Sequence, residues 1–156
     1  MCVTRFAQSE VKAYTVFLEN LPLYYSELTT NRKGEDGDSE LALLCDMRLV
    51  VTLLVVIDVL DQLTTLSLAM QTVNALPWEL LEHSHKFAAH LQVMVDELHL
   101  AAPTATTFPG LCAALDDLNK GEFMAVPLVS EGEDIPDVFE RICERLWQNL
   151  VRILFK

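Results

Sequence analysis

The chain has 156 residues, of which 51% are hydrophobic, and a formal net charge of −12. This length suffices for one domain with a sizeable buried core. The negative charge opposes attraction to nucleic-acid phosphates and to anionic membrane surfaces, so we expect this segment not to bind nucleic acid directly.

Apolar residues near the N-terminus recur at helical spacing and predict a first amphipathic helix. The helix should stop near Asn20, because Pro22 disfavours helical backbone in the residue before it. The apolar residues that carry this pattern are Phe6, Val11, Tyr14, Phe17 and Leu18.

Residues 20–38 are then expected to form a connector. Its second half is polar and contains two glycines, and the pair Arg32 and Lys33 lies beside several acidic residues that largely cancel its charge. We interpret this stretch as a mobile, solvated acidic loop, with Asp38 or Ser39 capping the helix that follows.

Residues 39–71 contain neither glycine nor proline and predict one long helix. Within them, residues 49–57 are almost wholly apolar, but Arg48 and Asp58 bracket them at about half the ~20 residues that a membrane span requires. A buried parallel strand is the rival interpretation of so many β-branched residues, and length favours the helix. A helix apolar on nearly all sides should be enclosed by other helices.

A third helix should begin between Asn74 and Pro77, since proline suits a first helical turn, and should end near Leu100, before Pro103. A shorter helix should follow a threonine-rich loop. The apolar face of the third helix comprises Leu80, Leu81, Phe87, Leu91, Val95 and Leu98.

The shorter helix is expected from Phe108 to Leu118, ending at Lys120 and Gly121, with an acidic loop over residues 121–134. A last helix should begin at Asp134, because aspartate favours the N-cap and proline the first turn. Its apolar residues at helical spacing are Phe139, Ile142, Leu146, Leu150 and Leu154.

No internal repeat or strictly alternating strand pattern competes with these helices. We therefore predict an all-α fold: a multi-helix bundle around one long, largely buried central helix, forming a single domain over residues 1–156. Its two loops should lie near residues 20–38 and 121–134.

The cysteines Cys2, Cys45, Cys112 and Cys143 form no CxxC pair and lack the spacing of a structural zinc site. The N-terminus shows no secretory signal, so we expect a reducing compartment in which the thiols behave as small apolar groups. Buried thiols, rather than disulfides, are the prediction.

Three histidines, His83, His85 and His90, fall within the third helix. His83 and His85 differ by about 200° around a helix axis, so they cannot easily hold one ion. Residues 79–83 are similar to an inverted zinc-protease motif, but Glu79 stands where that motif needs its first histidine. We predict histidines at the surface or near a helix cap, and no metal site.

The sequence also contains no recognisable arrangement of catalytic residues. The adjacent acids Asp116 and Asp117 should diverge on a helix, and the acids of residues 131–134 suit a helix start. No phosphate-binding glycine motif and no nucleophile elbow is present, and neither Cys45 nor Cys112 has a histidine at a specific spacing. We therefore predict no catalytic, cofactor or metal residues, and no enzymatic activity.

Residues 43–71 resemble the helical insertion of hAT-type transposases and their domesticated relatives, which include BED-type zinc finger proteins and general transcription factor II-I repeat proteins. In that family a comparable stretch reads approximately Leu-Ala-Phe-Leu-x-Asp-Ile, then Leu-Asn-x-Leu-Asn-Leu-x-Leu-Gln-Gly. Asp58 and Gln71 fit this frame, whereas Thr64 and Ser67 stand where the family has asparagines.

The resemblance extends along most of the chain. The segment from Arg5 to Leu18 is similar to the one before the family's insertion helix. Residues 85–91 resemble its Lys-x-Phe-x-x-Lys-Leu pattern, and residues 107–109 resemble its His-Phe-Pro element. Met47-Arg48-Leu49 lacks the family's tryptophan.

This resemblance implies what the chain lacks. The family's transposases bind divalent metal with two aspartates and a glutamate on an RNase H-like core, and none of these maps onto this chain. A zinc-binding DNA reader and the C-terminal dimerisation segment are not seen either. The implied function is a non-catalytic helical module that binds a protein partner or itself, in the nucleus.

Two other functions stay open: an unrelated helical adaptor or signalling bundle, which would place the chain in the cytoplasm, and a fragment of a metal-dependent transposase-like protein. Aromatic residues are favoured at the centres of interfaces, but burial in or beside the core is the favoured interpretation of those found here. The candidates are Tyr24, Tyr25, Trp78 and Trp147.

Overall fold

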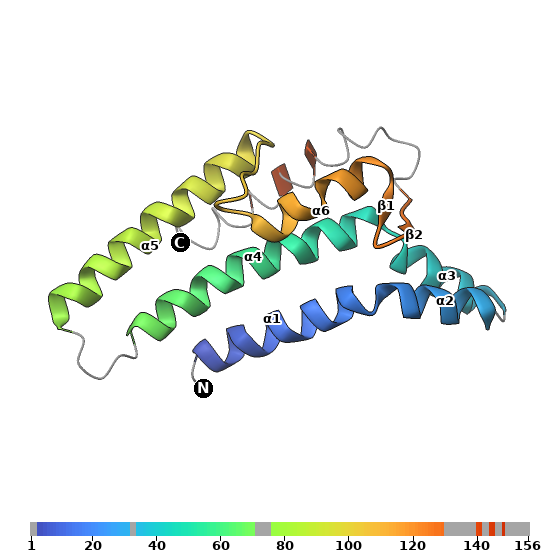
Figure 1. Cartoon of the computed structure of the whole chain (residues 1–156), viewed down its shortest axis with the longest axis horizontal. Helices are drawn as coiled ribbons and strands as arrows, with labels where there is room; N and C mark the ends of the chain where they lie inside the picture. Colours follow the sequence, from blue (N-terminus) through green and yellow to red (C-terminus); the bar gives the residue numbers. More distant parts are fainter. Residues whose placement is uncertain are drawn as a thin grey trace.

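The computed structural model describes residues 3–31, 34–70 and 76–129, together with residues 140, 141, 144, 145 and 148. It confirms the predicted all-α fold, in which helices surround a long central helix (Figure 1). The described helices and strands are α1 (Val3–Glu19), α2 (Leu21–Thr30), α3 (Gly34–Leu44), α4 (Met47–Met70), α5 (Pro77–His99), α6 (Pro109–Asn119), β1 (Glu122–Phe123) and β2 (Val126–Pro127).

Helix α4 forms the centre of the bundle. Helix α1 runs along one side of it, and α5 and α6 lie on the other (Figure 1). The side chains of α4 that these neighbours bury recur at helical spacing, and each contributes roughly 1.5–3 kcal/mol of hydrophobic stabilisation. They are Met47, Val50, Val51, Leu54 and Val55. No helix in the described part of the chain has the length and apolar character needed to cross a bilayer.

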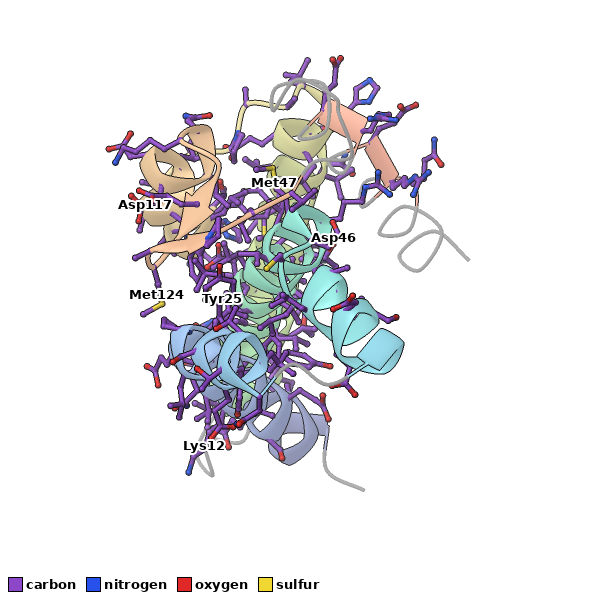
Figure 2. All side chains as sticks on the ribbon, turned by 90° about the vertical axis from the view of Figure 1, so that its right-hand side faces the viewer. Lys12, Tyr25, Asp46, Met47, Asp117 and Met124 are labelled. Atoms are coloured by element: carbon purple, nitrogen blue, oxygen red, sulfur yellow. The ribbon has the colours of Figure 1, made fainter. Side chains whose placement is uncertain are left out.

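Met47 shows how fully the start of α4 is enclosed. Viewed from the end of the molecule that carries α2 and α3, its side chain lies among the packed side chains, whereas Lys12 and Met124 point outward (Figure 2). The central helix therefore begins inside the core, consistent with the prediction that other helices enclose it.

The connector predicted over residues 20–38 is wrong, because α2 occupies most of its first half and α3 begins at Gly34. Asn20 closes α1, since its backbone and side-chain N–H groups both donate to the carbonyl of Val16. Pro22 then lies in the first turn of α2, where its missing N–H leaves no hydrogen bond unmade. The same proline that ends one helix thus begins the next.

The single helix predicted over residues 39–71 is also wrong, because α3 and α4 are separated at Cys45 and Asp46 and point in different directions (Figure 1). Val129 lies against this break: its N–H donates to the Cys45 carbonyl at 2.7 Å, and its carbonyl accepts from the Met47 N–H at 3.4 Å. Backbone groups that a continuous helix would pair internally are therefore paired with a distant segment.

Asp46, rather than the predicted Asp38 or Ser39, precedes the central helix; the latter two lie within α3. The Asp46 carboxylate accepts a hydrogen bond from the Arg48 N–H at 2.8 Å, as an N-cap side chain does. Asp46→Ala is expected to lower the free energy of unfolding by about 1 kcal/mol, because this N–H loses its acceptor. Urea unfolding followed by circular dichroism measures the change.

The matched control for that substitution is Asp116→Ala, which removes an exposed carboxylate from the body of α6. Its effect should stay within about 0.5 kcal/mol. Equal losses in the two variants would show that the Asp46 carboxylate does not cap α4.

Helix α5 has the predicted bounds, but only its second half enters the core. Its buried residues are Leu91, Met94, Val95 and Leu98, whereas Leu81, predicted on the apolar face, is 57% exposed. The start of α5 extends beyond α6 and lies beside the end of α4 (Figure 1). Within the described part of the chain, no second helix buries the apolar pattern of this half.

The acidic loop predicted over residues 121–134 contains a small antiparallel hairpin instead of loop alone. Phe123 pairs with Val126, and both side chains are buried. The two turn residues, Met124 and Ala125, have φ of 49° and 64°, values that a tight hairpin turn needs and side-chain-bearing residues disfavour. Burial of Phe123 and Val126 offsets this backbone cost.

Most of the last predicted helix lies outside the described residues. The five that are described, Glu140, Arg141, Glu144, Arg145 and Gln148, are helical and exposed. Their spacing places these polar side chains on one face of a helix.

Candidate functional site

Residues able to bind metal are dispersed in the described part of the chain, where no three histidine, cysteine, aspartate or glutamate side chains converge. His83 and His85 are exposed on α5, and His90 is half-buried with its Nε2 atom lacking a hydrogen-bond partner. Asp117 pairs with Lys120 at 3.3 Å while Asp116 faces solvent. The candidate groups named from the sequence that fall within the described residues are thus not brought together.

One carboxylate, that of Asp58, is buried in the core, with 4% of the residue exposed. Its two oxygens accept hydrogen bonds of 3.0 Å from the backbone N–H groups of Gly110 and Leu111, at the start of α6. The N-cap residue of α6, Phe108, has no side-chain acceptor, so Asp58 on α4 supplies one.

The geometry around Asp58 identifies it as a helix cap and not as a catalytic acid. Burial raises the pKa of its carboxyl, and the N–H groups of Leu111 and Gly110 oppose part of that rise. A Cβ at Gly110 would lie 2.9 Å from Oδ1 of Asp58, so glycine permits the close approach. Both oxygens face backbone amides, which leaves them occupied in binding α6 to α4.

A second polar cluster organises the loop between α5 and α6. The Glu97 carboxylate accepts hydrogen bonds from the Thr104 N–H at 2.9 Å and from the hydroxyls of Thr104 and Thr107. Thr107 is buried, and its neighbour Phe108 is fully enclosed. The carboxylate therefore fixes the loop that delivers Phe108 to the core.

The two described cysteines are free thiols; Cys45 is buried, as predicted, whereas Cys112 is half-buried. Burial raises the pKa of Cys45. Burial also raises the pKa of Cys112, and the negative charges of Asp58 and Glu97 add to that effect. Because the thiolate is the nucleophile, both environments suppress reactivity.

An apolar groove of about 450 Å³ lies between the end of α1, α2, α3 and the start of α4. The rings of Phe17 and Tyr24 stack in it with centroids 5.7 Å apart. The volume falls in the range of pockets that bind ligands or anchoring side chains. The lining residues are Phe17, Tyr24, Glu27, Leu28, Asn31, Glu40, Leu43, Leu44 and Leu49.

The position of the groove follows directly from the two errors in the sequence-based prediction. Its walls come from α2, which occupies the predicted connector, and from the end of α3, which breaks away from α4. Leu43 remains 64% exposed on the lip of the groove, although leucine has no polar group to gain from solvent. Sequence reasoning missed the groove because it missed α2 and the break between α3 and α4.

Exposed apolar side chains also occur where α4 ends and α5 begins. We call this region the hairpin surface and define it by four exposed side chains, Leu68, Leu76, Trp78 and Leu81. Trp78 is 65% exposed, in contrast to the burial favoured from the sequence. It is the largest of the four side chains and the one with the greatest capacity to anchor a partner.

The other aromatic candidates differ in exposure. Tyr24 borders the groove and is partly exposed, and Tyr25 packs against the core. Trp147 lies outside the described residues. Of the three that the structure describes, Tyr24 and Trp78 have surface available to a partner.

Comparison with protein-family models, with curated proteins and with solved structures gives no match over any part of the chain. The candidate site accordingly rests on the sequence and the geometry of the groove.

Proposed function

We propose that this chain is a non-catalytic helical interaction module, derived from the helical insertion of hAT-type transposases, that binds a protein partner or a second copy of itself. The observation that carries the proposal is the apolar groove, which presents Leu43 and Tyr24 to solvent. Exposed apolar surface of this kind marks interaction sites in folded proteins. The transposase origin is supported by the residue pattern of 43–71 and its flanks.

The chemistry of the described side chains supports binding over catalysis. The carboxylates of Asp58, which is buried, and of Glu97, which is half-buried, accept hydrogen bonds from backbone and hydroxyl groups of the fold itself. The thiols of Cys45 and Cys112 have raised pKa values. The net charge of −12 also argues against a nucleic-acid ligand. A nuclear location follows from the proposed origin, and a cytoplasmic one from an unrelated adaptor.

Site-specific photo-crosslinking tests the proposal in cells that make the native protein. A photoreactive amino acid at position 43 or 78 is expected to form discrete adducts with protein, because Leu43 and Trp78 are apolar and exposed. The same group at Asp116, which is exposed but polar in surroundings, is the matched control. Adduct masses on denaturing gels separate self-association from binding to another protein.

The contrary result is equally clear. If neither position forms an adduct above the Asp116 background, and sedimentation velocity shows one monomeric species at all concentrations, the chain is not an interaction module.

A further inference from the structure

We propose that the groove receives an amphipathic helix of a partner protein, one whose apolar face is bordered by lysine or arginine. This inference rests on the proposed function and specifies its partner. Three properties of the groove support it: its enclosure by helices, its apolar floor and the sign of its charges.

The floor and walls suit the apolar face of a helix. Phe17, Leu28, Leu44 and Leu49 line the groove from four different helices, so an inserted side chain would meet apolar surface on several sides. Leu43 stands exposed at the lip, where it can cover the inserted residue. Helices that dock in such grooves insert side chains spaced at i, i+3, i+4 and i+7.

The charges of the groove indicate the charge that its partner should carry. Among the described residues that line the groove, Glu27 on α2 and Glu40 on α3 carry carboxylates, and none of those described is basic. A carboxylate on each of two helices favours cationic side chains that flank an apolar stripe. Because the whole chain carries −12, a second copy would meet repulsion where a basic helix meets attraction.

A single surface charge contributes little to affinity, so we expect the apolar residues and the carboxylates of the groove to have different roles. The apolar residues should provide most of the binding free energy, because exposed ion pairs are worth only about 0–1 kcal/mol. Glu27 and Glu40 should select between partners of opposite charge and make binding sensitive to salt.

Fluorescence anisotropy with two model helices tests this inference on the full chain. The first probe is a labelled helix of about 18 residues, or five turns, made of leucine and lysine with one apolar face. The second is identical except that glutamate replaces every lysine. The lysine helix is expected to bind about tenfold more tightly, and its affinity should fall as salt is added.

Two leucine substitutions locate the binding surface. Leu43→Gln should weaken binding of the lysine helix about fivefold, since it removes an apolar contact without changing the charge. Leu100→Gln is the matched control, because Leu100 is an exposed leucine that belongs neither to the groove nor to the hairpin surface. Its binding should match that of the unsubstituted chain. Circular dichroism verifies that both variants fold.

The carboxylates are tested by the pair Glu27→Gln and Glu40→Gln together, which should remove most of the preference for lysine over glutamate. Equal binding of the two model helices to the unsubstituted chain, equal losses from Leu43→Gln and Leu100→Gln, or no binding of the lysine helix would each overturn the inference. Crosslinked adducts at position 43 would then still uphold the interaction function, with a partner of different chemistry.

Discussion

Replacing Asp58 with alanine is expected to lower the free energy of unfolding at neutral pH by about 3 kcal/mol. The substitution leaves the N–H groups of Gly110 and Leu111 without acceptors and removes a negative charge from the positive end of the α6 dipole. Because the carboxylate joins α4 to α6, the loss should appear as reduced stability of the whole fold. Urea unfolding monitored by circular dichroism measures it.

Asp61→Ala is the control for this experiment, since Asp61 lies one turn further along the same helix and is exposed. Its effect should stay within about 0.5 kcal/mol. A loss from Asp58→Ala no greater than this would mean that the buried hydrogen bonds do not hold α6.

The pH dependence gives an independent signature of Asp58. Burial raises its pKa in the folded chain above the unfolded value of about 3.9, even though the two N–H groups lower it in part. Between these two pKa values the folded chain holds the proton and the unfolded chain has lost it. The stabilising contribution of this proton is complete below the unfolded pKa and declines as pH rises through the folded pKa.

Asp58→Asn removes this titration and serves as the reference. The difference in unfolding free energy between the unsubstituted chain and this variant should decrease as pH rises above about 4. Other carboxylates cancel in the difference because both proteins contain them. If the difference increases over this range, the hydrogen bonds from the two N–H groups lower the pKa of Asp58 by more than burial raises it.

Phe108→Ala is expected to lower the free energy of unfolding by about 4 kcal/mol. The Phe108 side chain is fully buried, with 0% of the residue exposed, at the point where the loop from α5 enters α6. Its truncation removes buried apolar area and opens a cavity beneath the loop that Glu97 holds.

Two further variants serve as controls for Phe108→Ala in the same urea measurement. Phe108→Leu retains much of the apolar volume and should cost about 1–2 kcal/mol. Pro109→Ala alters the exposed neighbouring residue and should change stability by less than about 1 kcal/mol. Equal effects at positions 108 and 109 would contradict a core role for the phenylalanine.

Helical periodicity predicted the elements whose signals are local. The bounds of α5 and α6 follow from Pro77 and Pro109 at their first turns and from apolar spacing within them. Length and flanking charges rejected a membrane span, and the run of apolar residues indicated a central helix. These inferences needed only information from residues that are close together in the sequence.

The break between α3 and α4 could not be predicted in the same way. Residues 39–71 contain no helix breaker, and Asp46 is one polar residue in an otherwise helical pattern. The groups that stabilise the break belong to Val129, which is remote in sequence. Pro22 was ambiguous for a related reason, since a proline that ends one helix can equally begin another.

Asp58 and the groove were missed because both depend on tertiary packing. A single aspartate beside an apolar run gives no sign that two backbone amides from another helix will meet it. The apolar residues that line the groove fit a core pattern equally well. The positions of α2 and α3, which the sequence did not reveal, leave Leu43 64% exposed among the described residues.

The contact between Val129 and the break has a consequence for how the protein forms during synthesis. Helices α1, α2 and α3 and most of α4 leave the ribosome before Val129 has been translated. Until then the Cys45 carbonyl and the Met47 N–H lack their partner. We expect a nascent chain to continue α3 into α4, and the groove to acquire its final shape late, after the hairpin of β1 and β2 has emerged.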